Sequence, residues 1–213
     1  LSKMLATRDQ WLRPVVSDPT RESIERVLAN LVGEVLAPLG GKLAQFDRAA
    51  ELVEICQFCG ANVVSLDSQS PIAGLCDMQS LPTGEVNDLP LWRGLAELLL
   101  TKEGKPRKQL NKNIGLPPKD DYSTRLKQAL KEFIAEVDTV WLSELYGVTG
   151  LPDPSFSDDE WENLAALFTV LKLAAAHLGL VFQQTGMVDF TEIALSALNA
   201  LGAEDAPSDA SLL

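Results

Sequence analysis

The chain has 213 residues, of which 46% are hydrophobic, and it contains one histidine and three cysteines. This composition excludes collagen-like, disordered and disulfide-scaffold proteins, and the length is sufficient to bury a core in one domain or two lobes. The formal net charge of −12 predicts that most of the surface repels polyanions.

The first two predicted elements are helices. Apolar residues at three- and four-residue spacing indicate a helix from residue 24 to residue 36, begun by Asp18–Pro19 and stopped by Pro38 and Gly40–Gly41. The predicted inner face of this helix consists of Ile24, Val27, Leu28, Leu31, Val32, Val35 and Leu36. A second helix is expected over residues 42–59.

The middle of the chain is predicted to alternate loop and helix. Residues 61–87 are rich in Ser, Pro and Gly, which favours a loop with one short helix. Residues 88–101 should again be helical. Residues 122–145 carry one apolar stripe and are predicted to form a single helix closed by Gly147 and Gly150.

Two helix starts are marked in the last third of the chain. Ser157 followed by Glu160 is a capping box, and Asp189 followed by Glu192 repeats the same spacing. A long helix should therefore run from the capping box to Gly186. Its expected inner stripe is Trp161, Leu164, Phe168, Leu171, Ala175, Leu178 and Phe182, and the last helix should bury Phe190, Ile193, Ala194, Leu198 and Leu201 and end at Gly202.

These patterns predict an all-α fold, an irregular multi-helix bundle. The longest nearly apolar run, Leu173–Phe182, is half of the roughly 20 residues that a membrane span needs. We therefore expect no membrane contact. The absence of a secretory pattern and the odd number of cysteines favour a reducing, cytoplasmic setting. Because Leu1 is not an initiator and the final residues end without a cap, the chain is expected to be a fragment of a longer protein.

Catalytic and metal-binding signals are weak. The string around Lys42 lacks the glycine and hydroxyl spacing of a phosphate-binding loop, so no ATP site is expected. His177 lies in an apolar run, which favours a partly buried structural role. Cys56, Cys59 and Cys76 offer three thiolates, whereas a closed zinc site uses four ligands, so core cysteines are favoured over a metal site.

The strongest functional signal is a basic segment, residues 100–119. It holds six positive charges against Glu103, which leaves a net charge of −17 for the rest of the chain. The positive residues are Lys102, Lys105, Arg107, Lys108, Lys112 and Lys119. Such charge segregation indicates a local phosphate contact, although a lysine-rich loop is often only solvated surface. Trp92 and Arg93, one helix upstream, could add base stacking and a guanidinium contact.

Three segments together resemble a known family. They are LATRDQWL at residues 5–12, LLLTKEGKPRKQLNKNIGLP at residues 98–117, and GMVDFTEIALSALNALG at residues 186–202. In their order and spacing they resemble the UvrD/Rep-like helicases of superfamily 1, especially the RecB- and AddA-like helicase-exonuclease branch.

The resemblance implies that residues 1–189 form the 1B-type helical subdomain inserted in a RecA-like motor domain. Residues 190–213 would be the flanking helix and tail leading back into that motor. ATP and magnesium would be bound by absent parts of the parent protein, an ATP-dependent DNA helicase in recombinational repair, and a partner helicase-nuclease subunit could take part. DNA near the duplex junction would be gripped by Lys102, Lys105, Arg107 and Lys108, with Lys112 alongside.

A rival reading belongs to a different class. A helical protein-interaction or scaffold module would use the acidic surface, and the basic segment would then be incidental. Salt-dependent DNA binding separates the two readings, since only phosphate contacts release counterions.

Overall fold

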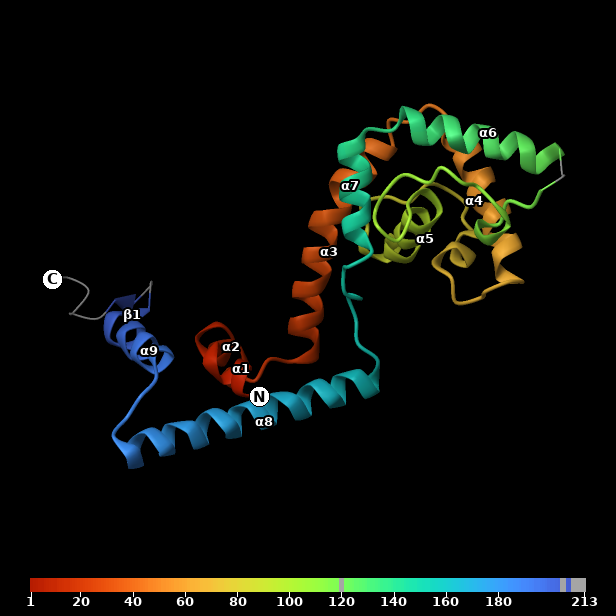
Figure 1. The fold of residues 1–213 in the computed structure, drawn as a ribbon. Helices are drawn as coiled ribbons and strands as arrows, with labels where there is room; N and C mark the ends of the chain where they lie inside the picture. Colours follow the sequence, from red (N-terminus) through yellow and green to blue (C-terminus); the bar gives the residue numbers. More distant parts are fainter. Residues whose placement is uncertain (119–120, 204–205, 208–213) are drawn as a thin grey trace. The chain divides into compact units, whose positions relative to one another are not determined.

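The computed structural model describes residues 1–118, 121–203 and 206–207, and its helices confirm the all-α class (Figure 1). The α-helices of this described part are α1 Ser2–Ala6, α2 Arg8–Val16, α3 Arg21–Leu43, α4 Ala49–Val64, α5 Leu89–Leu99, α6 Asp121–Glu136, α7 Thr139–Val148, α8 Asp158–Thr185 and α9 Phe190–Leu201. Short 3₁₀ helices are η1 Pro71–Leu75, η2 Val86–Asp88 and η3 Lys112–Ile114. Two-residue strands, β1 Gly202–Ala203 and β2 Ala206–Pro207, pair antiparallel.

The chain divides into two compact units. One contains residues 1–25 and the chain from residue 156 onward, and the other contains residues 26–155. The boundary expected at residue 189 does not coincide with this division, because α8 and α9 belong to the same unit as α1 and α2.

The core of the second unit is built from α3 to α7. Its largest fully buried side chains include Trp92 of α5, Leu36 and Leu39 of α3, and Leu52 and Ile55 of α4. Apolar residues at helical spacing on each of these helices face the shared core, as the 3.6-residue period requires. The loop between α4 and α5 is held by η1, where Ile72 and Leu75 are also buried.

Helix α3 continues through residues that were predicted to stop it. Pro38 lies inside the helix, and Gly40 packs so closely on the loop between η1 and η2 that a Cβ there would lie 2.6 Å from the Gly84 nitrogen. Leu39 and Leu43 are buried on the same turns. The prediction of a stop was wrong because burial of this last stretch outweighs the local cost of proline and glycine. The following helix accordingly begins at Ala49 rather than at residue 42.

The single helix predicted over residues 122–145 is two helices. A break at Val137–Asp138 separates α6 from α7, and the Asp138 carboxylate caps α7 by accepting the Val140 amide at 3.1 Å. An aspartate at an N-cap is favourable, so the break is local in origin. The apolar period runs through the break, which is why it was missed.

In the first unit, the predicted helix ends are confirmed. The Ser157 capping box is formed in both directions, and Gly186 ends α8 in the left-handed conformation with φ 67°. The Asp189 side chain caps α9 by accepting the Glu192 amide at 2.8 Å.

The predicted inner stripe of α8 is the covered side of that helix, since Leu171 is buried and the other six residues of the stripe are half-buried, whereas the predicted inner face of α9 is exposed. Of the α8 side chains only Leu171 is buried, and α9 buries none. Phe190, which was expected to face inward, is 89% exposed. The stripe pattern thus predicted the packing side of α8 correctly, and the prediction that α9 buries its stripe was wrong.

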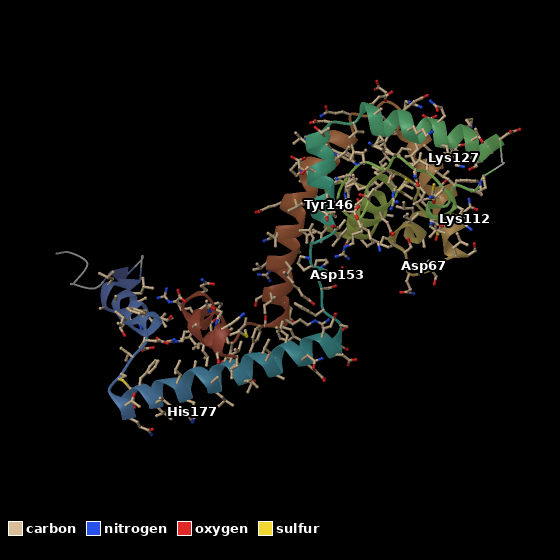
Figure 2. All side chains as sticks on the ribbon, viewed as in Figure 1. Asp67, Lys112, Lys127, Tyr146, Asp153 and His177 are labelled. Atoms are coloured by element: carbon tan, nitrogen blue, oxygen red, sulfur yellow. The ribbon has the colours of Figure 1, made fainter. Side chains whose placement is uncertain are left out.

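Helix α8 is also the one helix in the described ranges long and apolar enough to cross a membrane by length and composition. The core helix of a soluble protein can have the same length and composition. Lys172 in its middle pairs with Asp18, and His177 is exposed on its surface (Figure 2). The expectation that His177 is partly buried was wrong.

Candidate nucleic-acid interface

The basic segment begins with a tight hairpin-like turn after α5. The Thr101 amide donates to the Lys105 carbonyl at 2.8 Å, the Arg107 amide donates to the Leu99 carbonyl at 2.8 Å, and Leu100 bridges to Pro106. At the tip, Gly104 has φ 73°, a conformation that glycine adopts without strain. The backbone of this turn is therefore fixed by its own hydrogen bonds.

Tyr146 of α7 holds the turn from outside (Figure 2). Its hydroxyl donates to the Lys102 carbonyl at 3.1 Å, and a Cβ on Gly104 would lie 2.8 Å from its ring. Only glycine fits this close approach. The sequence gives no direct signal for Tyr146.

Four lysines of the segment point their charge at solvent: Lys102, Lys105, Lys108 and Lys112 are exposed. None of them forms an ion pair with a described carboxylate, in contrast to the paired Arg8, Arg21, Arg48, Arg93 and Arg125. The acidic Glu103 has a pKa below its usual range, first because Thr101 donates to it and further because Lys105 and Lys102 are near.

The end of the segment is anchored in the core of the second unit. Ile114 and Leu116 are buried, and Gly115 lies against α4 with φ 82°. Lys112 sits at the start of η3, where Asn111 caps the turn by accepting the Asn113 amide at 2.9 Å (Figure 2). The lysines thus stand on a backbone held at both ends. Lys119, the last of the predicted cations, lies outside the described residues.

Arg107 differs from the lysines because it is half-buried. Its Nε donates to the Glu97 carbonyl at 2.9 Å, and burial lowers the pKa of its guanidinium, an effect that the nearby Glu97 carboxylate opposes. It forms no ion pair with a described carboxylate.

A pocket of about 360 Å³ opens beside Arg107. The residues that line it come from η1, α5, the basic turn and α7: Pro71, Arg93, Ala96, Glu97, Leu100, Thr101, Lys102, Arg107, Tyr146 and Thr149. The structure therefore brings Arg93, Lys102 and Arg107 together at one hollow. Lys105, Lys108 and Lys112 do not line it.

The expected role of Trp92 must be corrected. Its side chain is fully buried, its Nε1 donates to the Thr83 carbonyl at 2.7 Å, and its ring centroid lies 6.2 Å from that of Trp141. A ring without exposed faces cannot stack on a base. Trp92 is a core residue, as its position on the apolar face of α5 requires.

Arg93 is accessible but already engaged. Its Nη1 donates to the Asp153 carboxylate at 2.6 Å and its Nη2 donates to the Leu151 carbonyl at 2.7 Å (Figure 2). These bonds tie the loop after α7 to α5. Arg93 reaches the rim of the pocket with a charge that is largely compensated, so a phosphate contact through it would have to displace Asp153.

Two of the three cysteines are core residues. Cys56 and Cys59 are buried on α4, and burial raises the pKa of both thiols, that of Cys59 to about 12. Cys76 is partly exposed. No group of three or more metal-ligating side chains occurs in the part of the chain that the structure describes.

Comparisons with protein-family models, curated proteins and solved structures found no match to this chain.

Proposed function

We propose that this chain is an accessory helical module of an ATP-dependent DNA helicase, and that its basic segment holds the DNA backbone without reading sequence. The observation that carries the proposal is the concentration of exposed, unpaired lysines, Lys102 to Lys112, on a rigid turn of an otherwise acidic protein. Lysine ammonium groups contact phosphates as point charges and carry no base specificity.

The resemblance of three chain segments supports the more specific form of the proposal. The module would be the 1B-type insertion of a UvrD/Rep-like motor of the RecB- and AddA-like helicase-exonuclease branch, acting in recombinational repair in the cytoplasm. ATP and magnesium would be bound by the motor, and a helicase-nuclease subunit is the proposed partner. Two of the segments meet in the first unit, where Arg8 of the first pairs with Asp189 of the third at 2.7 Å.

The acidic remainder of the protein restricts how DNA would be held. With a net charge of −17 outside residues 100–119, this segment is the main concentration of positive charge, and the rest of the chain on balance repels phosphates. We therefore expect weak, strongly salt-dependent binding by the chain alone.

The test is binding to a fluorescent duplex with a single-stranded tail across a range of salt concentrations. The variant replaces Lys105, Lys108 and Lys112 by alanine and leaves Arg107 intact. If all three contact duplex phosphates, the slope of log K against log salt becomes shallower by about 2.7. Over about 50 to 200 mM salt, these contacts account for about 40-fold of the loss in affinity.

The control variant replaces Lys3, Arg26 and Lys131 by alanine; these residues are also exposed and have no described ion pair. It removes the same charge from other places on the chain. A slope equal to that of the Lys105, Lys108 and Lys112 variant would mean that net charge alone drives binding, and the proposal would fail.

A second candidate function is a protein-interaction module, and the exposed apolar residues of the first unit favour it. Phe190, Ile193 and Leu198 of α9 are 89%, 54% and 57% exposed, and Leu173 of α8 is 66% exposed. Together with the acidic surface, these residues would dock on other protein. This candidate predicts DNA binding that is absent or unaffected by either triple change.

A further inference from the structure

The pocket beside Arg107 has the chemistry of a ligand site. The Arg107 guanidinium is fixed at one end, where Nε donates to the Glu97 carbonyl at 2.9 Å. Its two terminal nitrogens form no hydrogen bond with a described residue. In the described part, every fully buried side-chain nitrogen or oxygen has a partner, so these two nitrogens are not fully buried. The terminal nitrogens are therefore reachable from outside. A guanidinium held in this way presents a fork suited to two oxygens of one phosphate.

Lys102 adds a second positive charge at the same hollow. Its backbone is fixed by the Tyr146 hydroxyl, while its side chain is exposed. The Lys102 ammonium can therefore swing to a phosphate held on Arg107 without any movement of the turn.

The rest of the lining is suited to the other parts of a nucleotide. Pro71, Ala96 and Leu100 give an apolar surface, and the volume of about 360 Å³ is within the range of small-molecule sites. The Glu97 carboxylate accepts the Ser70 hydroxyl at 3.1 Å and has lone pairs left over. It repels a bare anion but can accept a hydrogen bond from a sugar hydroxyl or a base amino group.

We infer that this pocket binds one nucleotide unit, with its phosphate on Arg107 and Lys102, a donor group on Glu97, and its sugar or base against Pro71, Ala96 and Leu100. The inference rests on the proposed function, because the strand held by the neighbouring lysines is the source of the nucleotide. A free nucleoside monophosphate offers the same chemistry, and the experiment separates the two sources.

The first measurement is calorimetric titration of the full chain with deoxyadenosine monophosphate, with deoxyadenosine as the comparison. We expect the monophosphate to bind with millimolar affinity or better. Deoxyadenosine should bind at least about tenfold more weakly, because it lacks the phosphate that makes the charged contacts. Absence of monophosphate binding, or equal binding of both compounds, overturns the inference.

Two variants locate the site. Arg107→Gln removes the fork, and Thr149→Phe fills the pocket from an exposed position and leaves Arg107 in place. Each should weaken monophosphate binding about tenfold or more, whereas Lys131→Ala on α6 should not change it. If Arg107→Gln alone disturbs the fold, Thr149→Phe still decides the outcome. Unchanged binding in Thr149→Phe overturns the assignment to this pocket.

A short oligodeoxyadenosine identifies the source. Displacement of the monophosphate by the oligonucleotide in competition assigns the pocket to a nucleotide of the strand. Simultaneous binding of the monophosphate and the oligonucleotide assigns the pocket to a free nucleotide. Either result supports a pocket that holds a phosphate and a nucleoside. A failure of the DNA proposal would be seen separately, in the salt dependence of DNA binding by the Lys105, Lys108 and Lys112 variant, because these lysines lie outside the pocket lining.

Discussion

Replacing Asp189 by asparagine should loosen the attachment of α9 in the first unit while leaving its helix cap in place. Arg8 of α2 is almost fully buried, with its side chain 3% exposed, and it donates to both Asp189 carboxylate oxygens at 2.8 and 2.7 Å. It also donates to Glu192 at 2.9 Å, and its guanidinium lies 5.4 Å from the centre of the Phe182 ring. Because α9 buries no residue of its own, these polar contacts carry much of its attachment.

The expected cost is about 2 kcal/mol. Breaking a fully buried ion pair costs about 3–5 kcal/mol, and an exposed pair is worth about 1 kcal/mol or less. Asp189 is 42% exposed while Arg8 is buried, so the value lies between these limits. Asparagine remains a good N-cap, whereas Asp189→Ala also loses the bond to the Glu192 amide and should cost about 1 kcal/mol more.

Hydrogen–deuterium exchange of the α9 amides measures this local opening without requiring the whole chain to unfold. A loss of about 2 kcal/mol corresponds to about 30-fold faster exchange. Arg13→Gln is the control, because Arg13 is exposed on α2, the helix that carries Arg8, and has no described ion pair. Amides of the second unit serve as an internal reference. Equal α9 protection in wild type and Asp189→Asn, or the same loss in Arg13→Gln, would refute the argument.

The ion pair also predicts a pH dependence. The hydrogen bonds from Arg8 hold the pKa of Asp189 below its usual value of 3.8. The stabilisation is therefore fully present above that value and is lost as the pH falls through the lowered native pKa. The ratio of α9 exchange rates between Asp189→Asn and wild type should be constant near neutral pH and should approach one in strong acid. A constant ratio down to the lowest pH would contradict the assignment.

Two further predictions concern the second unit. Gly115→Ala should destabilise the chain by at least about 3 kcal/mol in chemical denaturation, because its Cβ would lie 2.2 Å from the Cys59 carbonyl oxygen at φ 82°. The control is Gly41→Ala, whose Cβ would meet nothing within 4 Å, and it should be neutral or stabilising. In the native protein an alkylating reagent should modify Cys76 well before Cys56 and Cys59, since burial raises the pKa of Cys59 to about 12; equal labelling of all three by mass spectrometry would show that α4 is not packed as described.

The basic segment shows how much of the candidate site the sequence could predict. The excess of lysines is visible in the sequence, and their exposure follows from the cost of burying charge. The convergence of Arg107 with Tyr146 and Thr149 at one pocket was not predictable, because α7 is about forty residues further along the chain. The same limit applies to Trp92, since an aromatic residue on a helix fits a core and a stacking surface equally well until its neighbours are placed.

The sequence by itself determined the features whose interactions are local. The Ser157 capping box, the Asp189 cap and the Gly186 helix end each depend on atoms within a few residues, so spacing alone predicted them. Only the tertiary structure decided that α3 passes through Pro38 and Gly40, because the burial that outweighs their local cost involves the distant loop at Gly84. It also decided that the stripe of α9 lies exposed while that of α8 is half-buried, since a stripe encodes the need for a partner surface and does not encode where that surface is.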